Sequence, residues 1–501
     1  MDHDSVPFEA PVPASYRIAD VREAYAEITR RGLDVMDEKI SQDPAYTSNE
    51  NGHFAWDVAL LIRGACLTWR VTGDPVHLQQ ASRWAAHMVA RTDEALHRTN
   101  WRGSAGPVWS AGPRYTAGIA TVGTIGGVPI QVQAAADSVV LEKLDRTAAQ
   151  LHVVRNGETV WSSPEASLLP DSDDYFPDVL ARRSSVHAAL LRGLPTPIDL
   201  STLSAGDFTL RPQFAAHFVH TGAIVRSLIA AAEALEEAGD AARNADITPE
   251  ELFLAAERAL LCHDDEIRTR SGQVWYITPE DFPGRRLGLE LPHNHVVDAA
   301  TSLLVLGRRK NDEGLRSLGN SLTRRFLGEI EAYSEGVLRH PWFYYPVDSD
   351  IFFGVRRDGP MAERIIPAVP RGEDSSHATI RVRALAEWKA IDHKLVPDDA
   401  LRAVALSFRR FYMANNAGVT SLRWLPGDEK DAPRFGHADT YAGAWGALHS
   451  WDSSFRRRLN SMAYRHPPTE IFGATVLSAA EILAMNSDDP TYASARRSAR
   501  E

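Results

Sequence analysis

Apolar residues recur at helical spacing over most of the chain. In HFAWDVALLIRGACLTWRV (53–71) they stand at 54, 58, 61, 62, 65 and 69, which is one face of a helix. The segment ends at TGDP, where Gly73 suits a C-terminal cap, Asp74 an N-cap and Pro75 the first helical position. A second helical segment, VHLQQASRWAAHMVART, follows at once. The pattern therefore predicts a helical hairpin with a very short turn.

The same arrangement of helix, turn and helix recurs along the chain. It is found in 294–333, in 376–415, in 214–236 with 249–263, and in 438–452 with 470–485. Repeated two-helix units are typical of open solenoids and of closed rings. Irregular spacing and long aromatic-rich connections favour the ring. We therefore expect a mainly α fold, an (α/α) toroid of helical hairpins.

One segment departs from helical periodicity. Between 119 and 210 apolar and polar residues alternate, as in VPIQVQA and AAQLHVVR, and RNGE places Asn-Gly between two strand-like runs. This predicts a small inserted β-rich domain. The expected organisation is an N-terminal arm at 1–15, the first part of the toroid at 16–118, the insert at 119–210, the rest of the toroid at 211–490 and a tail at 491–501.

Composition is that of a globular protein with a large core. The 501 residues are 44% hydrophobic and 24% charged, with a net charge of −12, which argues against a nucleic-acid or anionic-membrane binder. The N-terminus lacks a signal peptide, and no run of 18 apolar residues is present, so a cytoplasmic protein is expected. Cys66 and Cys262 lie in apolar helical patterns and are expected to be buried thiols. The expected partner is a small molecule or an oligosaccharide; a homodimer stays open.

Polar residues crowd the start of one predicted helix, RGEDSSHATIRVRALAEW. Asp374 is a good N-cap residue, and Glu373 precedes it. If the helix starts there, His377, Arg381 and Trp388 share one stripe, which suits a wet cavity for a charged or sugar ligand. The alternative is a capped helix with a solvated polar face.

A second helix start, ELPHNHVVDAATSLLVLG, carries His293, Asn294 and His295 in its first turn. A histidine near the positive end of a helix dipole tends to stay neutral and competent as a base. His295 and Asp298 are i, i+3 neighbours that could form an oriented pair. The alternative is a set of polar caps. The two histidines cannot both point at one ion from a regular helix, so neither a metal nor another cofactor is expected.

Aromatic residues gather in RHPWFYYPVDSD, a connection between helical pairs that holds Trp342, Tyr344 and Tyr345. Aromatic platforms in loops often stack on sugar rings, and a tyrosine there could serve as a general acid. A buried loop plug is the alternative. GPVWSAGPRYTAG places Tyr115 in a similar connection, and HFVHTG holds two histidines of a kind that is more often structural.

A four-residue acidic motif points in another direction. Asp171, Asp173 and Asp174 fit the D-x-D-D acid motif of class II terpene cyclases. The pattern is short, it lies within the predicted β-rich insert, and the Gln-Trp helix-end motifs of the squalene–hopene cyclase group are absent. It keeps a biosynthetic cyclase or isomerase open as an alternative.

Taken in order, these stretches resemble a family. FAWDVALLIRGACLTWRVTGDPVHL, LPHNHVVDAATSLLVLG, HPWFYYP and EDSSHATI follow one another as in bacterial (α/α)-toroid proteins of the six-hairpin type. That group includes polysaccharide lyases, unsaturated-uronyl hydrolases and the C-terminal domain of glucuronyl C5-epimerases. EDSSHA looks like an E-D-x-S-H-A signature of lyase-like members. The resemblance covers most of 50–485 except the insert.

The resemblance implies a set of roles. His377 would remove the proton α to a uronate carboxylate, oriented by Glu373 or Asp374, and Tyr345 would act as the acid, with His295 as a further catalytic residue. Asn294, with Arg381 or Arg339, would neutralise the carboxylate. The remaining substrate-binding candidates are His293, Trp342, Tyr344, Tyr115 and Trp388. We expect His377, His295 and Tyr345 to converge on one cavity.

The leading hypothesis is a carbohydrate-active lyase or epimerase that acts on a uronic-acid-containing glycan. A hydrolase of the same fold, with carboxylates such as Glu373 and Asp298, remains an alternative. So do the cyclase and a non-catalytic glycan-binding protein. A carboxyl-rich cavity would favour the hydrolase, a cavity of His, Tyr, Arg and Asn the lyase or epimerase, and a mostly apolar one the cyclase.

Overall fold

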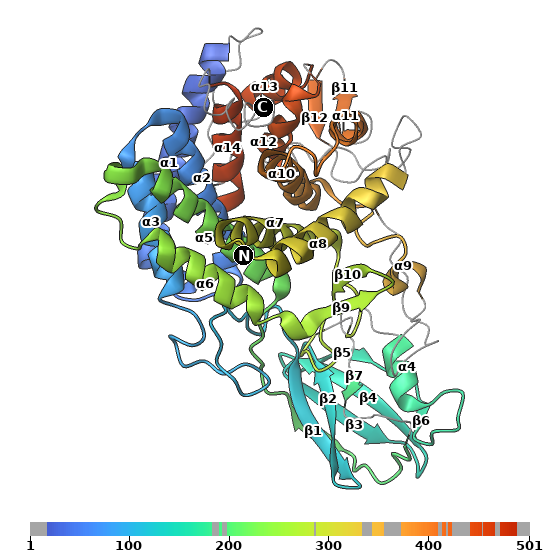
Figure 1. Ribbon diagram of the computed structural model, residues 1–501. Helices are drawn as coiled ribbons and strands as arrows, with labels where there is room; N and C mark the ends of the chain where they lie inside the picture. The colour runs from blue at the N-terminus through green and yellow to red at the C-terminus, as the bar shows by residue number, and fades with distance from the viewer. Residues whose placement is uncertain are drawn as a thin grey trace.

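The computed structural model describes eleven stretches of the chain: 18–182, 190–192, 198–284, 287–332, 343–354, 372–408, 413–416, 419–422, 441–452, 454–465 and 471–487. Figure 1 shows a helical body with a second region, rich in strands, attached at one end. The two regions have separate apolar cores.

The helical body holds the long helices. They are α1 (Ile18–Gln42), α2 (Ala59–Thr72), α3 (Pro75–Val89), α5 (Phe218–Ala238), α6 (Pro249–Leu261), α7 (His293–Lys310), α8 (Glu313–Ala332), α10 (Ser375–Ile391), α11 (Asp398–Ser407), α13 (Ser454–Arg465) and α14 (Gly473–Met485). Three short helices are α4 (Phe176–Arg182), α9 (Asp350–Phe353) and α12 (Ala442–Trp445), and a π-helical turn, Phe54–Val58, precedes α2.

The first predicted hairpin is confirmed by α2 and α3. Gly73 takes a left-handed conformation with φ of 72°, and its N–H donates to the carbonyl of Trp69. The side chain of Asp74 then accepts from the N–H of Val76, with Pro75 at the first position of α3. Because glycine tolerates positive φ and aspartate caps the next helix, four residues reverse the chain.

The core of the helical body follows from a chain of helix pairs. α2 packs against α3, α5 and α14, α5 against α6 and α7, and α7 against α8 and α10. α5 is long and apolar enough by composition to cross a membrane, but 94% of its apolar window is buried in the protein, as in a core helix. Cys66 is buried in α2, whereas Cys262 at the end of α6 is exposed, contrary to the expectation of two buried thiols.

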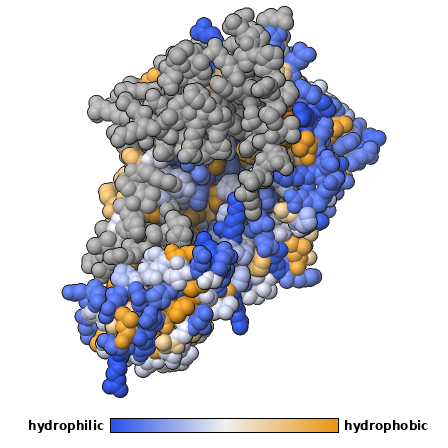
Figure 2. Space-filling view, turned by 180° about the vertical axis from the view of Figure 1, so that it is seen from behind, coloured by the Kyte–Doolittle hydropathy of each residue, from blue (hydrophilic) through white to orange (hydrophobic). Residues whose placement is uncertain are grey.

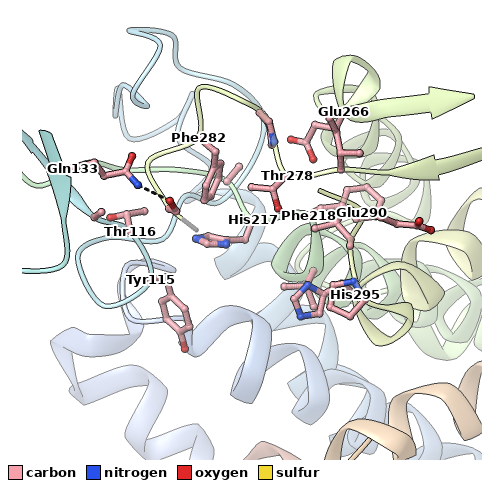
Figure 3. A pocket seen from close by; sticks show the side chains of 18 of the residues that line it. Tyr115, Thr116, Gln133, His217, Phe218, Glu266, Thr278, Phe282, Glu290 and His295 are labelled. Carbon is pink, nitrogen blue, oxygen red and sulfur yellow. Dashed lines mark hydrogen bonds between the residues drawn. The ribbon is translucent and has the colours of Figure 1, made fainter. Parts of the chain in front are cut away.

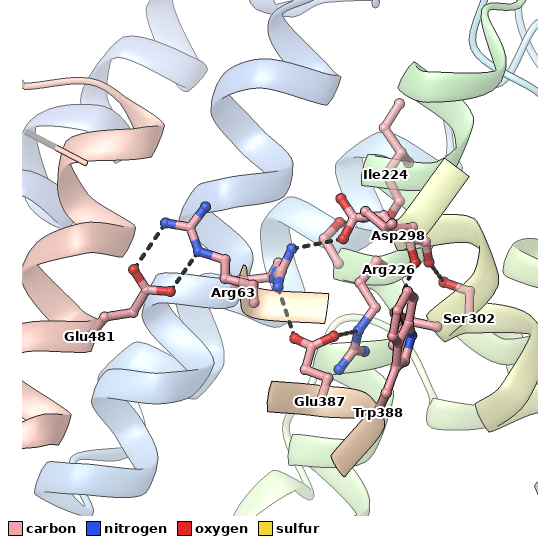
Figure 4. A network of polar contacts seen from close by, with 12 residues as sticks. Arg63, Ile224, Arg226, Asp298, Ser302, Glu387, Trp388 and Glu481 are labelled. Carbon is pink, nitrogen blue, oxygen red and sulfur yellow. Dashed lines mark hydrogen bonds and ion pairs between the residues drawn. The ribbon is translucent and has the colours of Figure 1, made fainter. Parts of the chain in front are cut away.

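A network of buried charges crosses the centre of this body (Figure 4). Its members are Arg63 (α2), Arg226 (α5), Asp298 (α7), Arg383 and Glu387 (α10) and Glu481 (α14). Arg63 lies 3.4 Å from Asp298 and 2.8 Å from Glu387, while Arg226 donates to the other oxygen of Glu387 at 2.8 Å. Arg383 makes a bidentate pair with Glu481 at 2.6 and 2.9 Å. Five helices are therefore joined by these pairs, in which the arginines and Asp298 are buried and must be paired, while Glu387 and Glu481 are partly exposed.

The strand-rich region contains two antiparallel sheets. One has the order β1 (Gly118–Ile125), β2 (Val128–Ala134) and β7 (Leu190–Arg192). The other has the order β5 (Glu158–Ser162), β4 (Ala148–Arg155), β3 (Ser138–Lys143) and β8 (Gly206–Thr209), with β6 (Ala166–Ser167) paired to β4. Alternate residues such as Ile130, Val139 and Leu151 fill the core that the sheets share. The predicted Asn156–Gly157 turn joins β4 to β5 with φ of 53° and 77°.

Two more hairpins belong to neither sheet. β9 (Ile267–Arg270) pairs with β10 (Gln273–Tyr276) between α6 and α7, and β11 (Met413–Asn416) pairs with β12 (Val419–Leu422) after α11. The first strand of the second hairpin overlaps the end of 376–415, for which the pattern predicted helix.

The expected fold class is wrong. The chain is 54% helical with about 15% strand, sheets are present, and no toroid is shown by the residues that the structure describes. The hairpins α2–α3, α5–α6 and α7–α8 pack as predicted. In contrast, α11 packs against α8 rather than closely against α10. The segment 441–452, predicted as a helix, holds only the four-residue α12 and a 3-10 turn. Apolar periodicity reports which face of a helix is covered, but it does not report which element covers it.

We predict that Glu387→Gln lowers the free energy of unfolding by about 3 kcal/mol, because Arg63 and Arg226 lose a buried counter-charge. Chemical denaturation measures the change. The matched control is Glu237→Gln, which removes a partly exposed pair with Arg70 and should cost less than about 1 kcal/mol. Equal losses for the two variants would contradict the importance of the network.

Candidate active site

A cavity of about 410 Å³ lies where the helical body meets the strand-rich region (Figure 3). We call it the junction cavity. Its wall is formed by the first turns of α5 and α7, strand β2, and the loop residues 114–117, 277–284 and 290–292. The side chains that line it include Arg114, Tyr115, His217, Phe282, His295 and Tyr345. Helix N-termini far apart in the sequence therefore meet at one cavity.

Asp374 both caps α10 and orients His377. One carboxylate oxygen accepts from the backbone N–H groups of Ser376 and His377, each at 3.1 Å. The other oxygen lies 2.6 Å from Nδ1 of His377. A carboxylate at that distance fixes the proton on Nδ1, so the basic lone pair of the neutral imidazole is on Nε2. The His377 side chain is 37% exposed, which gives the ring access to a ligand.

The charge of Asp374 is stabilised in place. Burial alone would raise the pKa of its carboxyl group, but hydrogen bonds from His377 and Ser376 outweigh burial and lower the pKa to about 2. The carboxylate therefore remains ionised at neutral pH. The negative charge of Asp374 beside Nδ1 stabilises the imidazolium that forms when Nε2 of His377 accepts a proton.

Tyr344 connects His377 to the junction cavity. Its ring centroid lies 5.6 Å from that of His377 and 5.2 Å from that of Tyr345, and its hydroxyl oxygen is 3.4 Å from Nε2 of His295. His295 and Tyr345 line the cavity, while His377 adjoins it through Tyr344. Side chains of α7, of α10 and of the loop that carries Tyr344 and Tyr345 thus lie close together.

Arg381 and Glu373 hold this loop rather than a ligand. Both side chains are fully buried and are paired at 2.6 Å. The Arg381 guanidinium donates twice to the carbonyl of Phe343, at 2.9 and 2.7 Å. Burial raises the pKa of Glu373 to about 7 against the lowering effect of Arg381. The expected substrate-binding role of Arg381 and catalytic role of Glu373 are therefore corrected to positioning of the loop that carries Tyr344.

Two further candidates are also part of the core. Trp388 is fully buried and its indole N–H donates to Thr301 of α7 at 2.8 Å. His293 is 5% exposed and Nε2 lies 2.9 Å from Glu329 of α8. The stripe of His377, Arg381 and Trp388 follows one face of α10, but none of the three lines the cavity, and only His377 adjoins it, through Tyr344. Arg339 and Trp342 lie outside the described residues.

Asn294 has an unusual environment. It is 1% exposed, and neither its amide nitrogen nor its amide oxygen has a hydrogen-bond partner among the described residues. An unpaired buried amide costs about 1–3 kcal/mol, although Asn294 is not among the residues that line the cavity. Asp298, the partner expected for His295, accepts from Arg63 at 3.4 Å.

Next to Tyr115 and His217, the buried His220 is held as a hydrogen-bond donor. The side-chain oxygen of Asn49 accepts from the N–H of Ala55, so its amide N–H group faces the carbonyl of Trp109 at 3.0 Å and Nδ1 of His220 at 3.2 Å. Nδ1 must then accept, and Nε2 carries the proton. Burial, with nearby His217, holds the pKa of His220 well below its ordinary value. His220 is thus a neutral donor and not a base.

The cavity wall presents neutral donors and one cation. Burial, with nearby His263, lowers the pKa of His217 to about 4, and its Nε2 has no hydrogen-bond partner among the described residues. Arg114 stacks on the ring of Tyr115 at 5.7 Å, and no carboxylate of the described residues lies within 4 Å of its guanidinium. Sequence reasoning placed both only among lesser candidates that are more often structural, because a lone histidine or arginine near a helix start gives no signal of its surroundings.

The carboxylates of the cavity already have partners. Glu266 lies 2.7 Å from Nδ1 of His263, and Glu290 lies 2.6 Å from Nε of Arg325. Within the described ranges no three His, Cys, Asp or Glu side chains come close enough to hold a metal ion. The polar side chains offered to a ligand therefore include histidine, tyrosine and arginine, on a wall that is otherwise largely apolar.

No family model matches the chain, and neither a curated protein nor a solved structure does. Function must therefore be argued from the geometry of this site.

We predict that Asp374→Asn lowers the free energy of unfolding by about 2 kcal/mol at pH 6, from the difference between an ordinary pKa of 3.8 and about 2 in the folded protein. A depressed carboxyl pKa contributes stability above the unfolded pKa and loses it as pH falls toward 2. The gap between the variant and the wild type should therefore shrink from pH 5 to pH 3 in denaturation experiments. A gap that stays constant with pH would contradict the assigned ion pair.

Proposed function

We propose that the protein is a carbohydrate-active enzyme that removes the proton α to the carboxylate of a uronic-acid residue, as a lyase or an epimerase. The observation that carries the proposal is the pair of Asp374 and His377, which adjoins Tyr344 and His295 at one end of the junction cavity. A base of fixed tautomer next to a tyrosine is the arrangement that such chemistry needs.

The proton to be removed is weakly acidic, so the enzyme must stabilise the enolate that forms. His377 would accept the proton at Nε2, and Asp374 would stabilise the resulting imidazolium. Tyr345 lines the cavity and Tyr344 adjoins it, so either hydroxyl could deliver a proton to a leaving oxygen. The role of proton donor, which the sequence assigned to Tyr345, thus has two candidates, Tyr344 and Tyr345.

The substrate carboxylate requires a cation or strong donors. Arg381 is buried in the loop support, and we assign this role to Arg114, whose guanidinium lines the cavity without an ion pair among the described residues. Asn294 supplies an unpaired amide at the start of α7, and neutral His217 offers a hydrogen bond to a hydroxyl. Tyr115 and Phe282 give the aromatic faces on which sugar rings stack.

A hydrolase is less well supported. It needs two carboxyl groups that face the same bond, one as acid and one as base or nucleophile. Glu373 is fully buried against Arg381, and Asp298 pairs with Arg63. The carboxylates at the cavity, Glu266 and Glu290, are both engaged.

A cyclase is also less well supported. Asp171, Asp173 and Asp174 are exposed in a loop of the strand-rich region, and none of them lines the junction cavity. More of the cavity surface is apolar than polar, so the wall alone does not exclude an apolar substrate, and the case against the cyclase rests on the position of the acidic motif.

The test is incubation with a panel of uronate oligosaccharides. Elimination is read at the ultraviolet band of the unsaturated product, and inversion by proton nuclear magnetic resonance. We predict that His377→Gln lowers the rate by about 10²- to 10⁴-fold, the usual contribution of a general base. The control is His152→Gln, since His152 contacts Glu142 and Ser162 on a sheet away from the cavity and should keep wild-type activity. A wild-type protein that neither eliminates nor inverts any substrate would overturn the proposal.

A further inference from the structure

A second cavity of about 410 Å³ lies between α7, α8 and the end of α10. We call it the α7–α8 cavity. α7 packs against both α8 and α10 (Figure 1). Of the described residues, none lines both this cavity and the junction cavity. Arg308, in the last turn of α7, follows His293 at its start by fifteen residues, so the two cavities adjoin opposite ends of a helix, about 22 Å apart along its axis.

Two glycines allow α8 to lie close against α7. A Cβ at Gly307 would lie 2.7 Å from the backbone nitrogen of Arg316, and a Cβ at Gly319 would lie 3.1 Å from the carbonyl oxygen of Ala300. Because glycine has no Cβ, the two backbones can approach at these points. Cγ of Arg316 is equally close to Gly307, so this side chain starts against α7, next to Arg308. Both guanidinium groups therefore line one cavity.

Both guanidinium groups keep donors free for a ligand. Arg308 donates from Nη1 to the carbonyl of Ile391, and within the described ranges it makes no ion pair. Arg316 donates from Nη2 to Glu313 at 2.7 Å, and the pair is weak because the Glu313 side chain is 79% exposed. Nη1 of Arg316 has no partner among the same residues. Two planar cations with free N–H groups suit the oxygens of a phosphoryl group.

Neutral groups add donors beside the two cations. Asn320 follows Arg316 by one turn of α8, and His393 follows the end of α10. Neither the Asn320 nor the His393 side chain has a hydrogen-bond partner in the described part of the chain. Lys389 fixes the turn that carries His393, because Nζ donates to the carbonyls of His393 at 2.7 Å and Val396 at 2.9 Å. An amide and an imidazole are thus available to a ligand.

Asp392 supplies the carboxylate among the described residues of this wall. Its Oδ1 accepts from the backbone N–H of Lys394 at 2.9 Å, and neither arginine of the cavity pairs with it. A carboxylate repels an inorganic anion, but it accepts hydrogen bonds from hydroxyl groups. The cavity has the volume of a small-molecule site, which is more than an inorganic ion needs. The wall therefore fits a ligand that carries both a phosphoryl group and hydroxyl groups.

A macromolecular partner has less support in the described residues. On the face that Figure 2 shows, hydrophobic residues of the helical body are scattered among hydrophilic ones. The two most exposed large hydrophobic side chains of the described residues, Leu254 and Phe353, lie on different helices, α6 and α9. The described surface therefore favours a small ligand.

We propose that the α7–α8 cavity binds a sugar phosphate. Arg308 and Arg316 bind the phosphoryl oxygens, and Asn320 and His393 donate to the same group. Asp392 accepts from hydroxyl groups of the sugar. No bond of the ligand is made or broken. The site does not depend on the proposed function, since it uses none of the residues of the junction cavity.

Titration calorimetry with glucose 1-phosphate, inorganic phosphate and glucose tests the proposal, in about 0.15 M salt to screen exposed charges. We expect one glucose 1-phosphate per chain, bound at least about tenfold more tightly than phosphate or glucose. Arg308→Gln and Arg316→Gln should each weaken its binding at least about tenfold, because charged hydrogen bonds are lost. Arg308→Lys, which keeps the charge without the fork of N–H groups, should bind with intermediate affinity. Asp392→Asn should narrow the preference for glucose 1-phosphate over phosphate.

Two control variants locate the ligand. Arg309→Gln changes the next residue of α7, which pairs with Glu236 at 2.6 Å and does not line the cavity, so it should bind as the wild type does. Arg114→Gln removes a cation of the junction cavity and should also bind normally. Circular dichroism of each variant reports that it is folded.

Three results would overturn the proposal. Binding that is lost in Arg114→Gln but kept in Arg308→Gln would place the ligand in the junction cavity. Equal affinities for phosphate and glucose 1-phosphate would contradict a site for a sugar phosphate. A folded wild-type protein that binds no glucose 1-phosphate would contradict the site altogether.

Discussion

The structure depends on pairing the charges that lie buried between the core helices. Removing a guanidinium or a carboxylate from water costs several kcal/mol, which only close and well-directed partners offset. Arg63 must meet both Asp298 and Glu387, and Arg226 must meet Glu387 from a third helix. A shift of one helix by a turn, about 5 Å, would break these contacts. The ion pairs therefore fix the heights of the helices as apolar contacts alone could not.

Because the ion pairs fix the position of each helix along its axis, the N-termini of these helices lie at one end of the body. There, α5 and α7 present His217 and His295 to the junction cavity, and α10 presents His377 beside it. Asp374 shows how stability and chemistry use the same atoms, since one oxygen caps the helix and the other orients the imidazole. A helix cap and a catalytic rim are therefore compatible roles for one residue.

Local features could be predicted from the sequence. The turn at Gly73, the strand turn at Asn156 and the cap at Asp374 are decided by backbone conformation and by neighbours within four residues, so their residue types specify them. The order of helices and strands followed in part from periodicity.

Features that depend on distant partners could not be predicted. The sequence does not show that Arg381 reaches Phe343 and Glu373 instead of a substrate, because burial is decided by the helices packed around it. The stretches that hold Arg114 and His217 were only lesser candidates in the sequence, although both side chains line the cavity. The closed ring was wrong for the same reason, since turn chemistry joins neighbours in sequence and does not determine how distant pairs assemble.

A double-mutant cycle between Arg63→Met and Glu387→Leu tests the central claim most directly, with the free energy of unfolding measured for all four proteins. If the buried charges set the packing of the helices, the two changes will be coupled by at least about 1.5 kcal/mol, and the double variant will be more stable than the sum of the single losses implies. Losses that add to within about 0.5 kcal/mol would contradict the claim.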